Sequence, residues 1–136
     1  MINVLYIAGA GRSGSTLLER ILGQLEGSVA VGELRHLWRE EPEGQRCGCG
    51  ELLTRCEFWA AVLGRANIRA DASGFRDIRQ LQREVDRIRH VPRILYPALA
   101  GSDFKRRHAE YTSLLRDMYT AIQEMTSAKV IVDSSK

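Results

Sequence analysis

The residue pattern with the clearest chemical meaning is a glycine-rich segment near the amino terminus, Gly9-Ala-Gly-Arg-Ser-Gly-Ser-Thr16. It lies between a short apolar run and a stretch with apolar residues at helical spacing, which predicts a turn between a strand and a helix. Glycines permit a tight turn in which backbone N–H groups converge on an anion, and the helix dipole adds positive potential. The spacing from Gly9 to Gly14 fits a nucleotide-triphosphate P-loop, but Ser15 replaces the lysine of that loop, and the nearest cation is Arg12. The segment therefore predicts an oxyanion site.

Two other chemically useful residues follow apolar runs. Glu33 comes after Val29–Val31 and Gly32, and Lys136 closes the segment Val132-Asp-Ser-Ser-Lys136. A carboxylate at a helix start is stabilised by the dipole by ~0.3–1 kcal/mol without any catalysis. The residues alone therefore favour a capping role for Glu33 over a role as a base. His36, one helical turn further on, could relay protons, and a surface histidine is the simpler interpretation.

The cysteines Cys47, Cys49 and Cys56 fall within ten positions. An odd number of cysteines without a signal peptide does not suggest a disulfide framework. The pattern could begin a zinc site, but a closed structural site needs four ligands, and His36 is the nearest candidate for the fourth. We favour a cysteine-bearing loop that holds no metal.

The elements that must position these residues alternate along the chain. Strands are expected at Asn3–Ala8, Val29–Val31 and Lys129–Asp133. Helical patterns cover 16–25, 33–39, 57–63, 75–88 (ended by Pro92) and the stretch from about 105 to 125. Thr16 and Glu19 match a capping box, so capping is as plausible for Thr16 as ligand contact. The alternation predicts an α/β fold with a parallel sheet, whose ligands bind beyond the carboxyl ends of the strands.

Composition limits the class of protein. The chain has 136 residues, 44% of them hydrophobic and 27% charged, and a formal charge of +3, which fits one globular domain. The charge is too small to indicate a nucleic-acid partner. No apolar run approaches the ~20 residues of a membrane span, and no signal peptide is visible, so we expect a cytoplasmic protein.

The segment Gly11–Leu18 resembles the 5′-phosphosulfate-binding loop of sulfotransferases that use 3′-phosphoadenosine 5′-phosphosulfate (PAPS). Its arginine-bearing form is similar to tyrosylprotein, carbohydrate and many bacterial members. Val31–Leu34 resembles the segment that carries the catalytic glutamate of that family, and Val132–Lys136 resembles the end of its third strand. Cys47–Trp59 is similar to an insertion of bacterial members. The resemblance covers the whole chain in order.

The resemblance implies a role for each matched residue. Glu33 would be the general base, while Arg12 and Lys136 would stabilise the transferring sulfuryl group and the leaving phosphate. The residues expected to bind the donor are Gly11, Arg12, Ser13, Gly14, Ser15 and Thr16. PAPS is the expected donor and no metal is expected. The acceptor hydroxyl of a small molecule, carbohydrate or peptide stays open.

The family carries a second donor-binding motif, an arginine and a serine that hold the 3′-phosphate, beyond the third strand. We therefore expect residues 1–136 to be the N-terminal portion of a sulfotransferase domain of P-loop-like, three-layer architecture, truncated after the third strand. A helical insertion spans roughly 42–128, and the portion alone is expected to be inactive. The alternatives are a P-loop kinase or NTPase-like nucleotide binder, in which Val130–Asp133 would organise Mg²⁺, and a non-catalytic fragment.

Overall fold

Three short parallel strands form the sheet of this computed structural model, which describes residues 2–10 and 12–135. The strands are β1 (Val4–Tyr6), β2 (Ser28–Ala30) and β3 (Val130–Asp133), in the order β1-β3-β2. Val4 and Val29 both lie opposite Ile131, so the three strands end at one level. Their carboxyl ends therefore face one common region of the molecule, as the sequence predicted for a parallel sheet.

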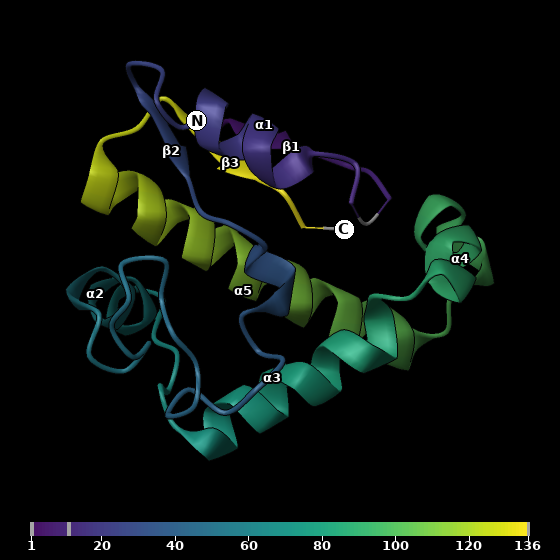
Figure 1. Cartoon of the computed structure of the whole chain (residues 1–136). Helices are drawn as coiled ribbons and strands as arrows, with labels where there is room; N and C mark the ends of the chain where they lie inside the picture. Colours follow the sequence, from purple (N-terminus) through teal and green to yellow (C-terminus); the bar gives the residue numbers. More distant parts are fainter. Residues whose placement is uncertain (1, 11, 136) are drawn as a thin grey trace.

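Helices lie on both faces of this sheet (Figure 1). Helix α1 (Ser15–Leu22) covers one face, and the long α5 (Ser102–Thr126) runs along the other. The remaining helices are α2 (Glu57–Arg65), α3 (Ala72–Val85) and α4 (Val91–Leu95), with 3₁₀ turns η1 (Leu34–His36), η2 (Ile88–His90) and η3 (Pro97–Leu99). The prediction of a mixed α/β fold with a parallel sheet is confirmed.

The main core lies between α5 and the segment that leads from η1 through α2 and α3. Trp38 and Phe75 are fully buried there and meet edge to face, with ring centroids 5.3 Å apart. From the predicted apolar stripe of α5, Tyr111, Met118 and Ile122 are buried. The stripe on α5 therefore forms the wall on which α2 and α3 pack.

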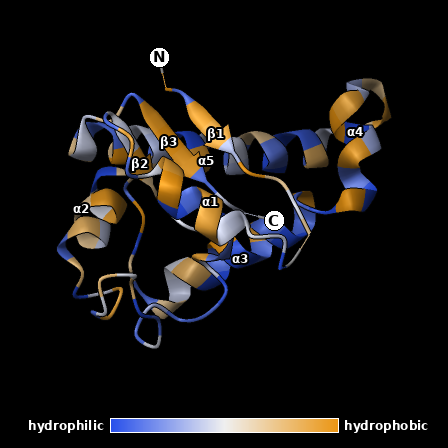
Figure 2. Ribbon diagram, turned by 45° about the horizontal axis from the view of Figure 1, so that its top comes forward, coloured by the Kyte–Doolittle hydropathy of each residue, from blue (hydrophilic) through white to orange (hydrophobic). Residues whose placement is uncertain are grey.

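The sheet edge formed by β1 is less well covered. Val4, Leu5 and Tyr6 are 37%, 44% and 52% exposed, and Leu17 and Ile21 on α1 are more than half exposed. Figure 2 shows β1 as a hydrophobic ribbon beside β3. The outer side of β1 has no strand partner within the described residues, so this edge presents unpaired backbone groups.

Two local predictions at helix ends were wrong. Helix α1 begins after Gly14, whose left-handed backbone (φ 81°) ends the loop, and no side chain caps the helix, so the capping box of Thr16 and Glu19 does not form. The helix through Phe75 ends at Val85 rather than near Pro92. Pro92 lies in the first turn of α4, where its missing N–H has no intrahelical partner to lose.

His90 also differs from expectation. Its charged neighbours in the sequence favour a solvated side chain, but only 7% of His90 is exposed, and its ring lies 5.2 Å from that of Phe104. No helix within the described residues is both long enough and apolar enough to cross a bilayer.

Candidate functional site

The glycine-rich loop joins β1 to α1 at the carboxyl edge of the sheet, as predicted. Arg12 and Gly14 both adopt left-handed backbone conformations, with φ of 64° and 81°. This conformation is costly for a residue with a side chain, by ~1–3 kcal/mol, and such strain concentrates at ligand sites. Leu18 N–H donates to the Gly14 carbonyl at 3.0 Å, so the preceding N–H groups at the start of α1 have no intrahelical acceptor. The start of α1 thus offers backbone N–H donors to a ligand at the end of the loop.

Ser15 lies at the base of this loop and is 4% exposed. Its buried hydroxyl has no hydrogen-bond partner among the residues that the structure describes. Leaving a buried hydroxyl unpaired costs ~1–3 kcal/mol, which a bound oxyanion would relieve. The side chains of Arg12, Ser13 and Thr16 are exposed and accessible to a ligand, whereas the predicted binding residue Gly11 lies outside the described residues.

Glu19 ties α1 to the other two strand ends. Its carboxylate is buried and accepts hydrogen bonds from the Gly32 N–H and, at 2.6 Å, from the Ser134 hydroxyl. The Ser134 N–H in turn donates to the Gly32 carbonyl at 3.0 Å. Glu19 therefore holds the segments after β2 and β3 against the helix that follows the glycine-rich loop.

The predicted base, Glu33, follows directly. Its side chain makes no capping bond to η1, and its Oε2 lies 2.7 Å from His36 Nδ1. The two side chains are 34% and 38% exposed, so the pair is accessible to solvent and to an acceptor. The structure thus brings His36 together with Glu33. Lys136, the third predicted catalytic residue, lies outside the described residues.

Asp133 at the end of β3 is a structural acceptor. It accepts hydrogen bonds from the Tyr119 hydroxyl at 2.6 Å and from the Ser135 N–H at 2.7 Å. Burial and this bond to a carboxylate raise the pKa of Tyr119 far above its ordinary value, because the phenolate would be desolvated and repelled. Ser135 Oγ accepts from the Arg35 N–H at 2.9 Å, which attaches η1 to the same strand end.

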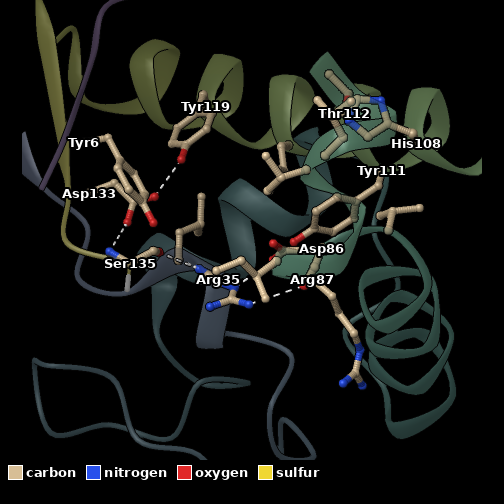
Figure 3. Close-up of a pocket in the computed structure, with 16 residues that line it drawn as sticks. Tyr6, Arg35, Asp86, Arg87, His108, Tyr111, Thr112, Tyr119, Asp133 and Ser135 are labelled. Atoms are coloured by element: carbon tan, nitrogen blue, oxygen red, sulfur yellow. Dashed lines mark hydrogen bonds and ion pairs between the residues drawn. The ribbon is translucent and has the colours of Figure 1, made fainter. Parts of the chain in front are cut away.

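A cavity of about 480 Å³ opens beside these strand ends. Figure 3 shows Tyr6, Tyr119 and Asp133 at one end of it, with Arg35 and Asp86 paired near its middle. The Arg35 Nε–Asp86 Oδ2 distance is 2.7 Å. The walls of the cavity are mainly apolar and come from the end of α3 and from η2, α4 and α5. They are formed by Val85, Ile88, Val91, Ile94, Tyr111 and Leu115. An apolar cavity with a few fixed polar groups is typical of a small-molecule site.

A second hollow, of about 650 Å³, lies on the other side of Arg35. It is strongly basic, since its lining includes Arg35, His36, Arg39, Arg79, Arg83, Arg87 and Arg89, against the single carboxylate of Asp86. The arginines at 79, 83, 87 and 89 thus surround a surface hollow next to the Glu33–His36 pair.

Sequence reasoning missed three residues of the site. Glu19 was given a local capping role, and Asp86 and Tyr119 were not selected. Tyr119 lies eight residues after Tyr111, a spacing that puts both on one helical face, and this signal could have identified it. Nothing local in the sequence distinguishes Asp86, because its partner Arg35 is 51 positions away.

No protein-family model matches this chain, and comparisons with curated proteins and with solved structures gave no match either.

Proposed function

We propose that this chain binds the 5′-phosphosulfate end of PAPS at the loop 9–16 and takes part in sulfuryl transfer to an acceptor hydroxyl. The observation that carries the proposal is the buried Ser15 hydroxyl at the start of α1, which has no hydrogen-bond partner among residues 2–10 and 12–135 and lies close in sequence to the left-handed backbone of Arg12. Both features favour an oxyanion in this loop. Ser15 replaces the lysine of a nucleotide-triphosphate P-loop, which favours a phosphosulfate ligand over a nucleoside triphosphate. This preference agrees with the resemblance to the PAPS-binding loop.

Sulfuryl transfer resembles phosphoryl transfer in being an in-line displacement in which charge develops on the equatorial and leaving oxygens. In the proposed reaction the acceptor oxygen bonds to sulfur while the bond from sulfur to the leaving phosphate oxygen breaks. Arg12 and the N–H groups at the start of α1 stabilise the leaving phosphate. Glu33 removes the acceptor proton, and His36, held at 2.7 Å, orients the carboxylate. Lys136 is assigned to the sulfuryl group by resemblance.

The P-loop-like, three-layer architecture belongs to the same proposal. It is supported by the succession of β1, glycine-rich loop and α1, and by the position of helices on both faces of the sheet. For the acceptor we propose the 480 Å³ cavity, because the ends of β1 and β3 and the residues directly after Glu33 line it. The apolar walls fit the body of an acceptor, leaving its hydroxyl at the polar end.

Calorimetry on the full chain tests the donor site. We expect binding of PAPS and of its desulfated product without metal, and weaker binding of Mg-ATP. Arg12→Ala should weaken PAPS binding by about 10–100-fold, the equivalent of one charge-assisted hydrogen bond. Arg20→Ala, which removes an exposed arginine from α1, outside the loop, is the matched control and should bind normally. A preference for Mg-ATP that EDTA abolishes would instead support a kinase or NTPase.

Sulfuryl-transfer turnover tests the proposed role of Glu33 as the base. Glu33→Gln should reduce kcat by ~10²-fold or more and leave PAPS affinity unchanged, because the carboxylate acts only on the acceptor proton. Glu26→Gln, an exposed carboxylate outside the site, should retain wild-type turnover. Unchanged turnover in Glu33→Gln would contradict the role of Glu33 as general base and leave it a structural role only.

A further inference from the structure

Three thiols that the proposed transfer reaction does not use converge at one point, away from the strand ends. The Sγ atoms of Cys47, Cys49 and Cys56 all lie within 4.8 Å of one another, and those of Cys49 and Cys56 are 3.8 Å apart. All three are free thiols. Within residues 2–10 and 12–135 this is the one cluster of three or more cysteine, histidine or carboxylate side chains with metal-ligand spacing.

The backbone around the first two thiols is built as a tight turn. Arg46 and Leu52 pair in an antiparallel bridge, the Cys47 N–H donates to the Glu51 carbonyl at 2.8 Å, and the Gly50 N–H donates to the Cys47 carbonyl at 2.9 Å. Gly50 closes the turn with φ of 93°, a conformation that favours glycine. The turn brings the side chains of Cys47 and Cys49 to one side, although the two are only two positions apart.

The third thiol arrives from the start of α2. Cys56 immediately precedes the helix, and its N–H donates to the Leu52 carbonyl at 2.9 Å, so a second turn folds it back toward the first. Cys56 is the N-cap residue of α2, so the third thiol lies at the amino-terminal end of that helix. The Arg46 guanidinium, which donates to the Gly50 carbonyl at 2.8 Å, adds a cation on the same turn.

The separations fit a tetrahedral metal–thiolate centre. With zinc–sulfur bonds of about 2.3 Å, two sulfurs of a tetrahedron lie about 3.8 Å apart, which is the Cys49–Cys56 distance. The upper bound of 4.8 Å on the other pairs exceeds this edge by about 1 Å, which small side-chain rotations can close. A disulfide would join two of the sulfurs and leave the third unused, whereas a metal accounts for the convergence of all three.

We propose that Cys47, Cys49 and Cys56 bind one zinc ion as thiolates, with a solvent molecule as the fourth ligand on the exposed side of Cys49. Binding releases the three thiol protons to solvent. Thiolate ligands select soft or borderline metals, and zinc is the one that takes a tetrahedral set without redox change. This site is separate from sulfuryl transfer, for which no metal is expected.

The zinc ion would join the irregular segment 42–56 to α2. This segment contains neither helix nor strand, and Leu53 and Cys56 are its buried contacts with the core beside Trp59. Because the unfolded chain holds no preformed site, the binding free energy of a metal that links two turns of the segment to the start of α2 stabilises the folded protein. We therefore expect a structural effect, seen as a rise in the unfolding temperature when zinc is bound.

The test measures metal in the full chain purified under reducing conditions with zinc in the growth medium. We expect about one zinc ion per chain by mass spectrometry, and a sulfur-to-metal charge-transfer band when cobalt replaces zinc. Cys49→Ser should lose the zinc during dialysis against a mild chelator. Glu51→Gln, which changes a neighbouring carboxyl group and keeps all three thiols, is the matched control and should retain it.

Either of two results on the wild type would overturn the proposal: three titratable thiols in a zinc-supplemented preparation that holds no metal, or an oxidised pair among the three cysteines with no metal bound. Retention of zinc by Cys49→Ser would also overturn it. If Cys49→Ser does not fold, the cadmium-113 resonance of the cadmium-loaded wild type decides, because its chemical shift reports the number of bound sulfurs. A cadmium-113 chemical shift that indicates no sulfur ligands refutes the proposed site. None of these readouts depends on PAPS binding.

Discussion

The carboxylate of Glu19 connects the helix that follows the glycine-rich loop to the ends of the other two strands. Its removal is therefore expected to lower the stability of the protein. Glu19 is 5% exposed and accepts from the Gly32 N–H and the Ser134 hydroxyl. A hydrogen bond to a charged group contributes ~1.5–3 kcal/mol net of its desolvation. In Glu19→Gln the amide oxygen can accept one bond, worth ~1 kcal/mol, and its NH₂ group then faces the second donor. We expect a loss of about 2–4 kcal/mol in the free energy of unfolding.

Urea unfolding of the full chain measures this loss. With a slope of about 2 kcal/mol/M, the midpoint should fall by about 1–2 M at an unchanged slope. Glu26→Gln, on the exposed surface beyond α1, should stay within about 0.5 kcal/mol of wild type. In a double-mutant cycle with Ser134→Ala, the coupling energy should be about 1–3 kcal/mol. A midpoint for Glu19→Gln equal to that of Glu26→Gln, or no coupling to Ser134, would refute the role of Glu19 in holding the segments after β2 and β3 against α1.

Three further predictions concern single side chains. Tyr119→Phe removes the bond to Asp133 and should cost about 1.5–3 kcal/mol at neutral pH by urea unfolding. Because folding raises the pKa of Tyr119, the free energy of unfolding of the wild type should fall as the pH rises above about 10, where the phenol of the unfolded chain ionises. Tyr119→Phe should lose less stability over this range. Parallel pH profiles of the two proteins would contradict this. Burial and neighbouring arginines lower the pKa of His90, so the stability of the wild type should decline as the pH falls through about 6.5. His90→Gln should flatten that decline. An equal slope of stability against pH between pH 8 and 5.5 in wild type and variant would contradict this. Phe75→Ala should cost about 3–5 kcal/mol in thermal or urea unfolding, and the half-buried Phe58→Ala less; the reverse order would contradict the position of the core.

The local patterns in the sequence predicted the elements well. The apolar run before the glycines gave β1, the run before Asp133 gave β3, and the stripe of Tyr111, Met118 and Ile122 gave the buried face of α5. Each of these signals repeats within a few residues, at the period of a strand or a helix. The position of the loop at the carboxyl edge of a parallel sheet then follows from topology rather than from side chains.

Residues with distant partners could not be predicted in this way. Glu19 has the spacing of a capping box with Thr16, yet its partners lie 13 and 115 positions away. The neighbourhood of Asp86 gives no sign of its pairing with Arg35, and the environment of His90 depends on packing against Phe104. In each case tertiary contacts decide the role of a residue whose local pattern suggests another.

The cysteines lie between these two cases. Their spacing suggested a possible metal site but supplied only three ligands, so a loop without metal was the simpler interpretation. The structure adds what spacing cannot show, namely that two turns bring the three sulfurs within 4.8 Å of one another. A count of ligands along a sequence is therefore a weaker guide than their convergence in space.

The central position of β3 also has a consequence for the time at which the sheet can form. Among the described residues, both β1 and β2 pair only with β3, and Val4 pairs with Ile131, which is synthesised 127 residues later. At a synthesis rate of roughly 5–20 residues per second, β1 waits on the order of 6–25 s for its partner. Throughout that time an apolar strand is exposed on the nascent chain, where it can pair with other chains. The parallel sheet can therefore form only after β3 has been synthesised, late in the production of these 136 residues.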